Sequence, residues 1–386
     1  MHKKFIYVLS LLLITSTFVA CADSSNNMKA NDMVTLSEIN QIENYNIGDY
    51  DNLIFPESIK FKQVDKLYTF SVLTDGNNPE ESASINVHAK EKMIELIEMY
   101  SKLEISESDI EFNTNYDANS TAIVTLHYFD SYNNITYTYA PNNSFTIERN
   151  DKSENDVHYG KCLSHSMIDD YTDIHLEKES ESLSAVDAIL LCNEYVADKV
   201  VNIIPENRLD PRSISLFKNN DGTYSYYIVY AKEYLGLNLS EASEYIHIDS
   251  GFVKPSYLSV QIDENGNIYK IMNNYSNIYD ESSVHEINSL YIRLEDALGL
   301  LSNYLAKEKQ YKVESVSMVY FLPTRIDKGS SKMSYTQYKP GYEVILESRF
   351  PSDANLYPRK TAYIDMQTGE IYICDSVDFE QYFGLG

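Results

Sequence analysis

Apolar and polar residues alternate along much of the chain, which is the pattern of half-buried β-strands. One early stretch, Lys90–Leu103, instead repeats its apolar residues at helical spacing and predicts an amphipathic helix. A hairpin is expected around the polar turn Asp130–Asn134. Residues 51–148 are therefore predicted to form an N-terminal α+β domain. Its strands are expected at residues 67–73, 83–88, 110–113, 122–129 and 135–139.

The second half of the chain contains an internal repeat. Amphipathic helices are predicted at Ser184–Val201, with Ser184 as N-cap, and at Arg293–Lys307. Three strand patterns follow each helix, at 213–218, 224–233 and 258–272, and at 314–321, 342–348 and 360–374. The polar residues 149–182 are expected to form a linker. The predicted fold class is therefore α+β, with the N-terminal α+β domain followed by two tandem helix-on-antiparallel-sheet (αβββ) units, residues 183–280 and 281–386.

Both units close on similar hairpins, Ile262–Tyr269 and Ile364–Tyr372. In each, an Asp precedes the turn and can bond the loop backbone, and a Gly supplies the positive φ that a short turn needs. Together with Leu294-Glu295-Asp296-Ala297 and Gly341-Tyr342-Glu343-Val344, the second hairpin resembles the PepSY domain pattern. The resemblance covers residues 290–376, with a weaker echo at 184–272 that lacks Thr-Gly-Glu. It implies an inhibitory or regulatory role and provides no catalytic residues.

The amino terminus has the order of a secretory signal. Lys3 and Lys4 precede an apolar run, Phe5–Val19, and small residues lead to Cys21. This order resembles the lipobox of bacterial lipoproteins, although Phe18 departs from the usual Leu. The resemblance implies cleavage after residue 20, a diacylglycerol on the Cys21 thiol and a tether over residues 21–50. An uncleaved anchor is the alternative, but the apolar run is shorter than the ~20 residues that span a bilayer.

The charge of the chain limits its partners. Its 58 acidic and 31 basic residues give a net charge of −27 at pH 7. Nucleic-acid binding depends on neutralising phosphates with Lys and Arg, so nucleic acid is excluded as a partner. Anionic lipid surfaces repel such a chain as well. The membrane is therefore expected as a partner only through the lipid anchor.

Three cysteines follow Cys21, and an odd number cannot pair completely within one chain. Cys192 lies in a helical apolar pattern and is expected to be a small buried hydrophobe. A bridge between Cys162 and Cys374 stays open, and so does the disulfide status of all three cysteines.

Candidate chemistry is sparse. His158, Cys162, His165 and His175 are metal-ligand types, but their spacing fits no zinc finger, and we expect no metal. The motifs of serine hydrolases and zinc peptidases are missing. Ser215 and Lys218 have Ser-x-x-Lys spacing without its companion motifs. The remaining candidates are Glu241, Glu244 and Asp249 around His247, and a tyrosine-rich strand with Tyr224, Tyr226, Tyr227, Tyr230 and Tyr234.

These observations favour a non-enzymatic protein without a cofactor. We expect a lipoprotein on the extracytoplasmic face of the cell membrane that binds or regulates an envelope protein or peptide. Two alternatives stay open. One is an envelope hydrolase using acidic or His/Cys residues. The other is a peptidoglycan or glycan binder using an exposed tyrosine face.

Overall fold

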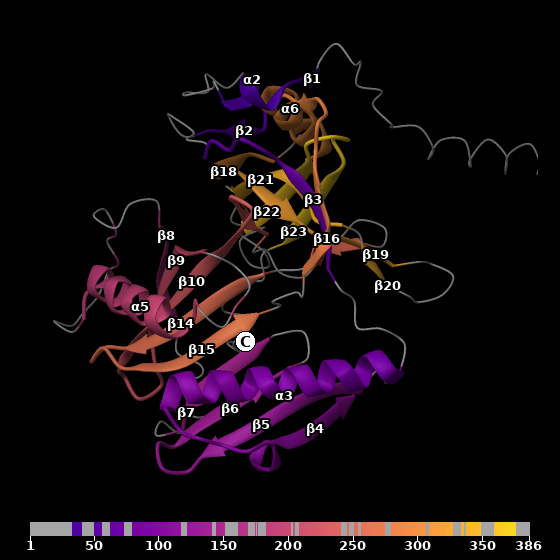
Figure 1. The fold of residues 1–386 in the computed structure, drawn as a ribbon. Helices are drawn as coiled ribbons and strands as arrows, with labels where there is room; N and C mark the ends of the chain where they lie inside the picture. The colour runs from indigo at the N-terminus through magenta and orange to yellow at the C-terminus, as the bar shows by residue number, and fades with distance from the viewer. Residues whose placement is uncertain are drawn as a thin grey trace, which may run out of the picture.

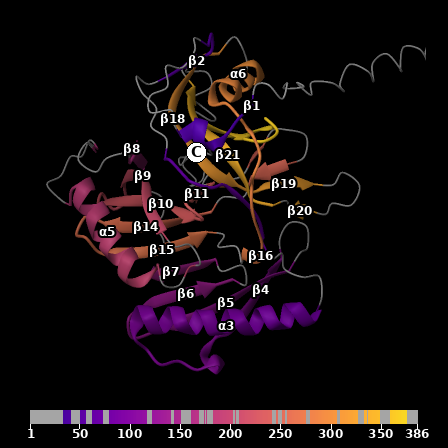
Figure 2. The ribbon, with the colours of Figure 1, turned by 45° about the horizontal axis from the view of Figure 1, so that its top comes forward.

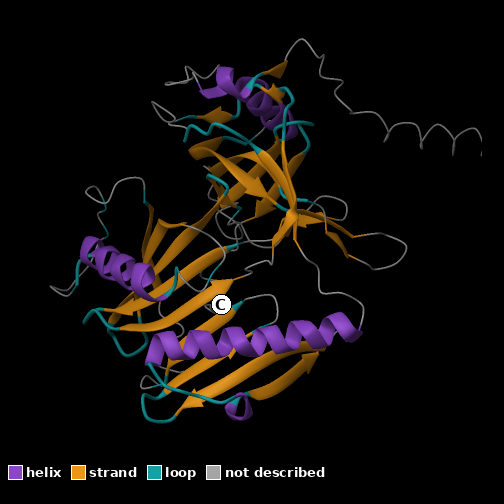
Figure 3. Cartoon of the chain, viewed as in Figure 1, coloured by secondary structure: helices purple, strands orange, loops and turns teal. Residues whose placement is uncertain are grey.

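The computed structural model describes the chain in segments between residues 33 and 375. These segments are 33–40, 50–55, 62–72, 79–116, 122–140, 144–150, 161–168, 174, 176, 183–201, 204, 208–240, 245–246, 251–253, 256–274, 279–305, 309–326, 333–335, 337–348 and 359–375. Strands hold 51% and helices 22% of the described residues, so pairing between strands dominates the fold (Figure 3).

Over the described residues, 16 strands join into one mixed sheet that runs through two lobes (Figure 1). The first, which we call the α5 lobe, contains helices α3 (Pro79–Ser101) and α5 (Ala185–Lys199) and the 3₁₀ helix η2 (Glu107–Asp109). Its strands, in spatial order, are β4 (Glu111–Tyr116), β5 (Ala122–Asp130), β6 (Ile135–Tyr139), β7 (Phe145–Arg149), β15 (Ile268–Asn274), β14 (Tyr257–Asp263), β10 (Tyr224–Tyr234), β9 (Arg208–Lys218) and β8 (Lys161–Met167).

The second part, the α6 lobe, contains helices α2 (Leu36–Asn40) and α6 (Leu294–Tyr304). Its strands of the large sheet are β2 (Leu53–Ile54), β11 (Leu237–Leu239), β18 (Tyr311–Phe321), β21 (Lys339–Ser348), β22 (Arg359–Asp365), β23 (Ile371–Asp375) and β12 (Tyr245–Ile246). Smaller pairings join β1 (Met33–Val34) to β17 (Tyr291–Ile292), β3 (Tyr68–Val72) to β16 (Tyr279–Glu286), and β19 (Pro323–Ile326) to both β13 (Gly251–Val253) and β20 (Met333–Tyr335).

The lobes meet through the short strand β11. It pairs antiparallel with β10 through Glu233 and Tyr234, and parallel with β18 through Val319 and Tyr320. Within the α5 lobe, β15 pairs with β7, and this pairing joins the strands β4–β7 to the rest of the sheet. Figure 2 shows the same arrangement from a second direction.

The predicted fold class, an α+β protein with two αβββ units, is wrong. Each helix is followed by four long strands instead of three, β9, β10, β14 and β15 after α5, and β18, β21, β22 and β23 after α6. These strands do not close two separate sheets, because β7–β15 and β11–β18 pairing joins them to one large mixed sheet. Alternating apolar residues indicate a strand but not its neighbour, so the sequence could not show this continuity.

One helix begins earlier than the pattern indicates. Residues 83–88 are predicted as a strand but lie in α3, which runs from Pro79 to Ser101. The alternation of apolar and polar residues in this short stretch does not reflect a strand. The helix continues into Ala89, Met93 and Ile97, which recur at helical spacing and are buried. The residues predicted as a linker, 149–182, include β8, which pairs with β9. The division into domains otherwise stays a prediction.

Each lobe has its own hydrophobic core. In the α5 lobe, α3 and α5 cover one face of the sheet, and buried residues of both helices pack with β5–β7, β9, β10, β14 and β15. In the α6 lobe, α6 packs on β18, β21 and β22. Residues 33–40 and 53–70 contribute Val34, Ile39, Leu53 and Phe70 to this second core, so the start of the described chain lies on the α6 lobe.

Local signals in the sequence set the helix start and two turns as expected. Ser184 caps α5, its Oγ accepting a hydrogen bond from the Asp187 N–H at 3.1 Å. The Oδ1 of Asp263 accepts bonds from Asn265 and Asn267 N–H at 2.9 Å each. The Oδ1 of Asp365 likewise accepts hydrogen bonds from the N–H groups of Gln367 and Thr368, at 2.8 and 3.0 Å. The glycines of the two turns, at 266 and 369, have φ of 85° and 72°.

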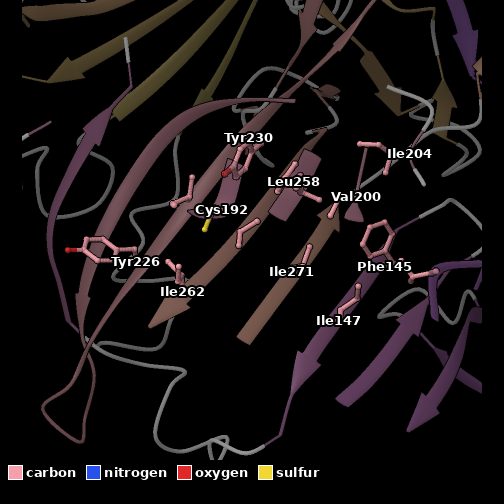
Figure 4. Close-up of a cluster of buried hydrophobic side chains, with 14 of the residues drawn as sticks. Phe145, Ile147, Cys192, Val200, Ile204, Tyr226, Tyr230, Leu258, Ile262 and Ile271 are labelled. Carbon is pink, nitrogen blue, oxygen red and sulfur yellow. The ribbon is translucent and has the colours of Figure 1, made fainter. Parts of the chain in front are cut away.

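Cys192 is buried against the sheet, as its sequence pattern predicts, and Figure 4 shows it among side chains of the α5-lobe core. Burial raises the pKa of its thiol from 9.0 to about 12. Burial, with the charges of Asp187 and Glu264, raises the pKa of Tyr226 from 10.0 to about 12. Burial also raises the pKa of further core tyrosines, namely Tyr137, Tyr139, Tyr195, Tyr269 and Tyr320.

We expect the protein to lose stability steeply in alkali. The buried groups stay neutral in the folded state, whereas the unfolded chain ionises near pH 9 to 10, so stability is full below about pH 9 and declines as pH rises toward 12. Urea unfolding at increasing pH, with tyrosinate absorbance recorded in parallel, measures this. The expectation fails if tyrosinate appears at its ordinary pH while the near-ultraviolet circular dichroism is still native.

Candidate functional site

Glu343 is the centre of a buried polar cluster on the face of the α6-lobe sheet opposite α6. The residue as a whole is 4% exposed. The Ser317 hydroxyl donates to Oε2 at 3.1 Å, and the Tyr363 hydroxyl donates to Oε1 at 3.0 Å. Ser317 and Tyr363 are its direct cross-strand neighbours on β18 and β22, which places the three side chains in a row on one face.

The fourth member of this Glu343 cluster comes from the other lobe. Arg212 of β9 donates from Nη2 to Glu343 Oε2 at 3.0 Å. Arg212 is the extra residue of a β-bulge, since Ser213 pairs with Val229 and Pro211 pairs with Tyr230. A bulge turns its side chain away from the regular alternation of the strand. The bulge therefore allows Arg212 to leave its own sheet face and bridge the two lobes.

The partners of Glu343 determine what this cluster can do. Two hydroxyl donors and a guanidinium all point hydrogens at one carboxylate, which satisfies a buried charge. A general base instead needs a lone pair directed at a substrate. The arrangement is suited to holding the two lobes in one geometry, and we assign the Glu343 cluster this structural role.

An aromatic group lies beside the Glu343 cluster on the same sheet face. The Phe321 ring stacks on Tyr363 with centroids 5.6 Å apart and meets Tyr372 at 5.4 Å. Gly341 makes room for it, because a Cβ at this position would lie 2.6 Å from Phe321 Cε1. The Gly of the Gly-Tyr-Glu-Val strand is thus required by packing.

The metal-ligand candidates are only partly described. His158, His175 and Cys21, the predicted site of lipid attachment, lie outside the described residues. Cys162 and His165 lie on β8, where the Cys162 Sγ donates to the Ser164 carbonyl at 3.7 Å and His165 Nδ1 lies 2.7 Å from Ser215 Oγ. Within the described segments, His, Cys, Asp and Glu side chains form no group of three or more that could hold a metal ion.

The other sequence candidates do not converge on a reactive centre. Ser215 is 1% exposed, and Lys218 is three residues along the same strand, so their side chains leave opposite faces. The acidic group around His247 lies outside the described residues. The described cysteines, Cys162, Cys192 and Cys374, form no disulfide with one another.

The tyrosines of β10 belong to the core and do not form an exposed face. Tyr226 and Tyr227 are 1% and 6% exposed. Tyr224, Tyr226 and Ile228 share the helix-covered face of β10. The Tyr226 hydroxyl donates to the Leu183 carbonyl at 2.6 Å, and the Tyr230 hydroxyl donates to Asn193 Oδ1 at 3.0 Å. Sugar stacking on these rings would require the core to open.

A shallow cleft of about 460 Å³ lies on the α6 lobe where the described chain begins. Residues 35–37, 65–67 and 286–291 line it. Lys66 Nζ and Glu286 Oε2 form an ion pair there at 2.7 Å, and the Leu290 side chain is 43% exposed. The mixed lining does not identify a ligand class.

The surface that stands out is the outer edge of the α5 lobe, which we call the β4 edge (Phe112, Phe129, Tyr132 and the strand β4). Phe112 and Phe129 are 52% and 55% exposed, and Tyr132, in the β5–β6 turn, is 91% exposed. Lys90 of α3 lies over the Phe112 ring, 4.6 Å from its centroid. Sequence reasoning missed this surface, because exposed aromatic residues on a strand look the same as core residues in the alternation.

Comparisons with known proteins add no function. No protein-family model matches the chain, and no curated protein matches it. A solved structure of an uncharacterized protein from Eubacterium rectale ATCC 33656 aligns at a TM-score of 0.48 and 15% sequence identity, over 88% of this chain and 99% of that one. The resemblances to lipoproteins and PepSY domains stay predictions. Among the described residues, no helix has the length and apolar content needed to cross a membrane.

Proposed function

We propose that the protein is a lipid-anchored, extracytoplasmic binding or regulatory module for an envelope protein or peptide and acts without catalysis. The observation that carries this proposal is the β4 edge, where Phe112 of the outermost strand β4, Phe129 of the adjacent strand β5 and Tyr132 of the β5–β6 turn are exposed, with Phe112 and Phe129 on opposite faces of the sheet. Aromatic side chains are enriched where proteins bind one another.

The position of the β4 edge supports this function. The signal-like amino terminus directs Cys21 to the membrane, and the described chain begins at Met33 on the α6 lobe. A fully extended segment between these residues reaches about 40 Å. In Figure 1 the strand β4 lies at the end of the molecule opposite β1. Anchoring at Cys21 would therefore leave the β4 edge facing away from the lipid.

We expect a photoreactive phenylalanine analogue at position 132 to capture one discrete envelope partner in intact cells. Tyr132 is 91% exposed, so the replacement leaves the core unchanged. The adduct should disappear when Phe129→Ser removes the exposed aromatic ring three residues earlier in the chain. The measurement is the mass shift of the protein after irradiation, followed by identification of the captured chain.

Position 304 provides the matched control, because Tyr304 is 49% exposed but belongs to α6 in the other lobe. An adduct of equal yield from position 304 would contradict a specific surface at the β4 edge. Cys21→Ser should release the protein from membranes in the same cells and lower the adduct yield. Retention of Cys21→Ser on membranes would contradict lipid anchoring.

A further inference from the structure

The β4 strand lacks the protection that outer strands usually carry. It pairs with β5 through six consecutive residue pairs, Glu111↔His127 to Tyr116↔Ala122, without a register shift. It contains neither proline nor lysine. On its other side, the described residues provide no strand. Bulges, lysines, prolines and short length are the devices that keep sheet edges from pairing with other chains.

The other ends of the large sheet carry these devices. β8 has a register shift between Cys162 and Ser164 and begins with Lys161. β12 and β2 contain two residues each. Among the described ends of this sheet, β4 is therefore the one built for pairing with an additional strand.

The two faces beside β4 set the side-chain pattern that such a strand would need. Phe112 pairs with Leu126, which is buried under α3, so Phe112 faces the helix side. Glu111 and Asn113 alternate to the other side and are exposed. An added strand would place apolar residues beside Phe112 and polar residues beside Glu111.

Charge selects the polar residues. The segment from residue 89 to 113, which contains most of α3 and the start of β4, has seven acidic side chains and three lysines. Of these acids, Glu111 lies on the face of β4 that the cationic residues of an added strand would occupy. A cationic strand would be attracted to this surface. A second copy of this chain would be repelled, because it brings the same acidic segment to the contact.

Resting on the proposed function, we infer that β4 binds an extended cationic segment of its partner by strand addition. The segment contributes main-chain hydrogen bonds along β4, with lysine or arginine alternating with apolar residues. The alternate apolar residues pack beside Phe112, and the cationic residues lie beside Glu111 and Asn113.

The test uses the full-length mature protein and a short fluorescent peptide that alternates lysine and valine. We expect saturable binding by fluorescence anisotropy, about tenfold weaker when alternate peptide amides are N-methylated, since methylation removes strand hydrogen bonds without changing charge. Asn113→Lys should weaken binding of the unmethylated peptide by a similar factor. Ser37→Lys, which adds the same charge on the exposed side of α2, should leave binding unchanged.

Three results would overturn the inferred binding of a cationic strand. They are equal affinity for the methylated peptide, equal binding of a peptide that alternates glutamate and valine, and lack of binding by the lysine–valine peptide. If the adduct from position 132 persists in any of these cases, the proposed function is retained and the binding of a cationic strand by β4 is rejected. If the peptide binds as expected but no adduct forms at position 132, strand addition at β4 is retained and the proposed envelope partner is rejected.

Discussion

Glu343→Ala should lower the free energy of unfolding by about 3–5 kcal/mol, because it removes the buried carboxylate that pairs with the guanidinium of Arg212. Ser317 and Tyr363 lose their acceptor in the same step. The pair is well shielded, with side-chain exposures of 17% for Arg212 and 5% for Glu343. Urea unfolding of the mature chain, followed by near- and far-ultraviolet circular dichroism, measures the loss.

Glu347 on the same strand is the matched control. It pairs with Lys312 at 3.5 Å, and the two side chains are 44% and 52% exposed. Its replacement by Ala should cost about 0–1 kcal/mol. Replacing Arg212 and Glu343 together by Met should recover much of the stability, because both charges of this pair are then removed. Equal losses for Glu343→Ala and Glu347→Ala would contradict the assigned role of the Glu343 cluster.

Gly341→Ala should destabilise the protein by about 1–3 kcal/mol, because the added methyl group overpacks a filled site. Its Cβ would lie 2.6 and 2.7 Å from two atoms of the Phe321 ring, which is stacked on Tyr363 and cannot move freely. The carbonyl oxygen of Ile364 is 3.1 Å away on the other side. Thermal and urea unfolding measure the change.

Gly299→Ala tests the same chemical change with the opposite expected sign. Gly299 lies within α6, and the atom nearest to a Cβ there is Tyr50 Cε1 at 3.8 Å, an ordinary contact. Ala in place of Gly within a helix should stabilise the protein by about 0.5–1 kcal/mol. Phe321→Leu should reduce the cost of Gly341→Ala, since it opens the overpacked site. Independent, additive effects of these two changes would contradict the proposed clash.

The elements that the sequence predicts correctly are set by neighbouring residues. The Ser184 cap and the Asp263 and Asp365 turns depend on contacts within a few positions, and the residue types there match the geometry. The burial of Cys192 follows from the apolar face of its own helix. Most strands after α5 and α6 also follow the alternation of their own residues. The stretch 83–88 misleads because a short alternating run fits a strand or a helix start equally well.

The sheet and the Glu343 cluster depend on contacts that no local pattern encodes. Arg212 and Glu343 are 131 positions apart. The Tyr-Glu-Val pattern indicates that Glu343 lies on the face opposite Tyr342, where an acidic residue is usually solvated. The structure instead places Arg212 of the other lobe against Glu343, an arrangement that depends on the bulge at Arg212 and on the pairing of β11 with β18.

The narrow join at β11 has a mechanical consequence. Two connections hold the lobes together. One is the pairing of Asn238 and Leu239 with Val319 and Tyr320, and the other is the contact between Arg212 and Glu343. If the protein is anchored at the α6 lobe and pulled at the β4 edge, the force passes through these few contacts at β11. We expect the pairing of β11 with β18 to break under force before the hydrophobic core of either lobe unfolds.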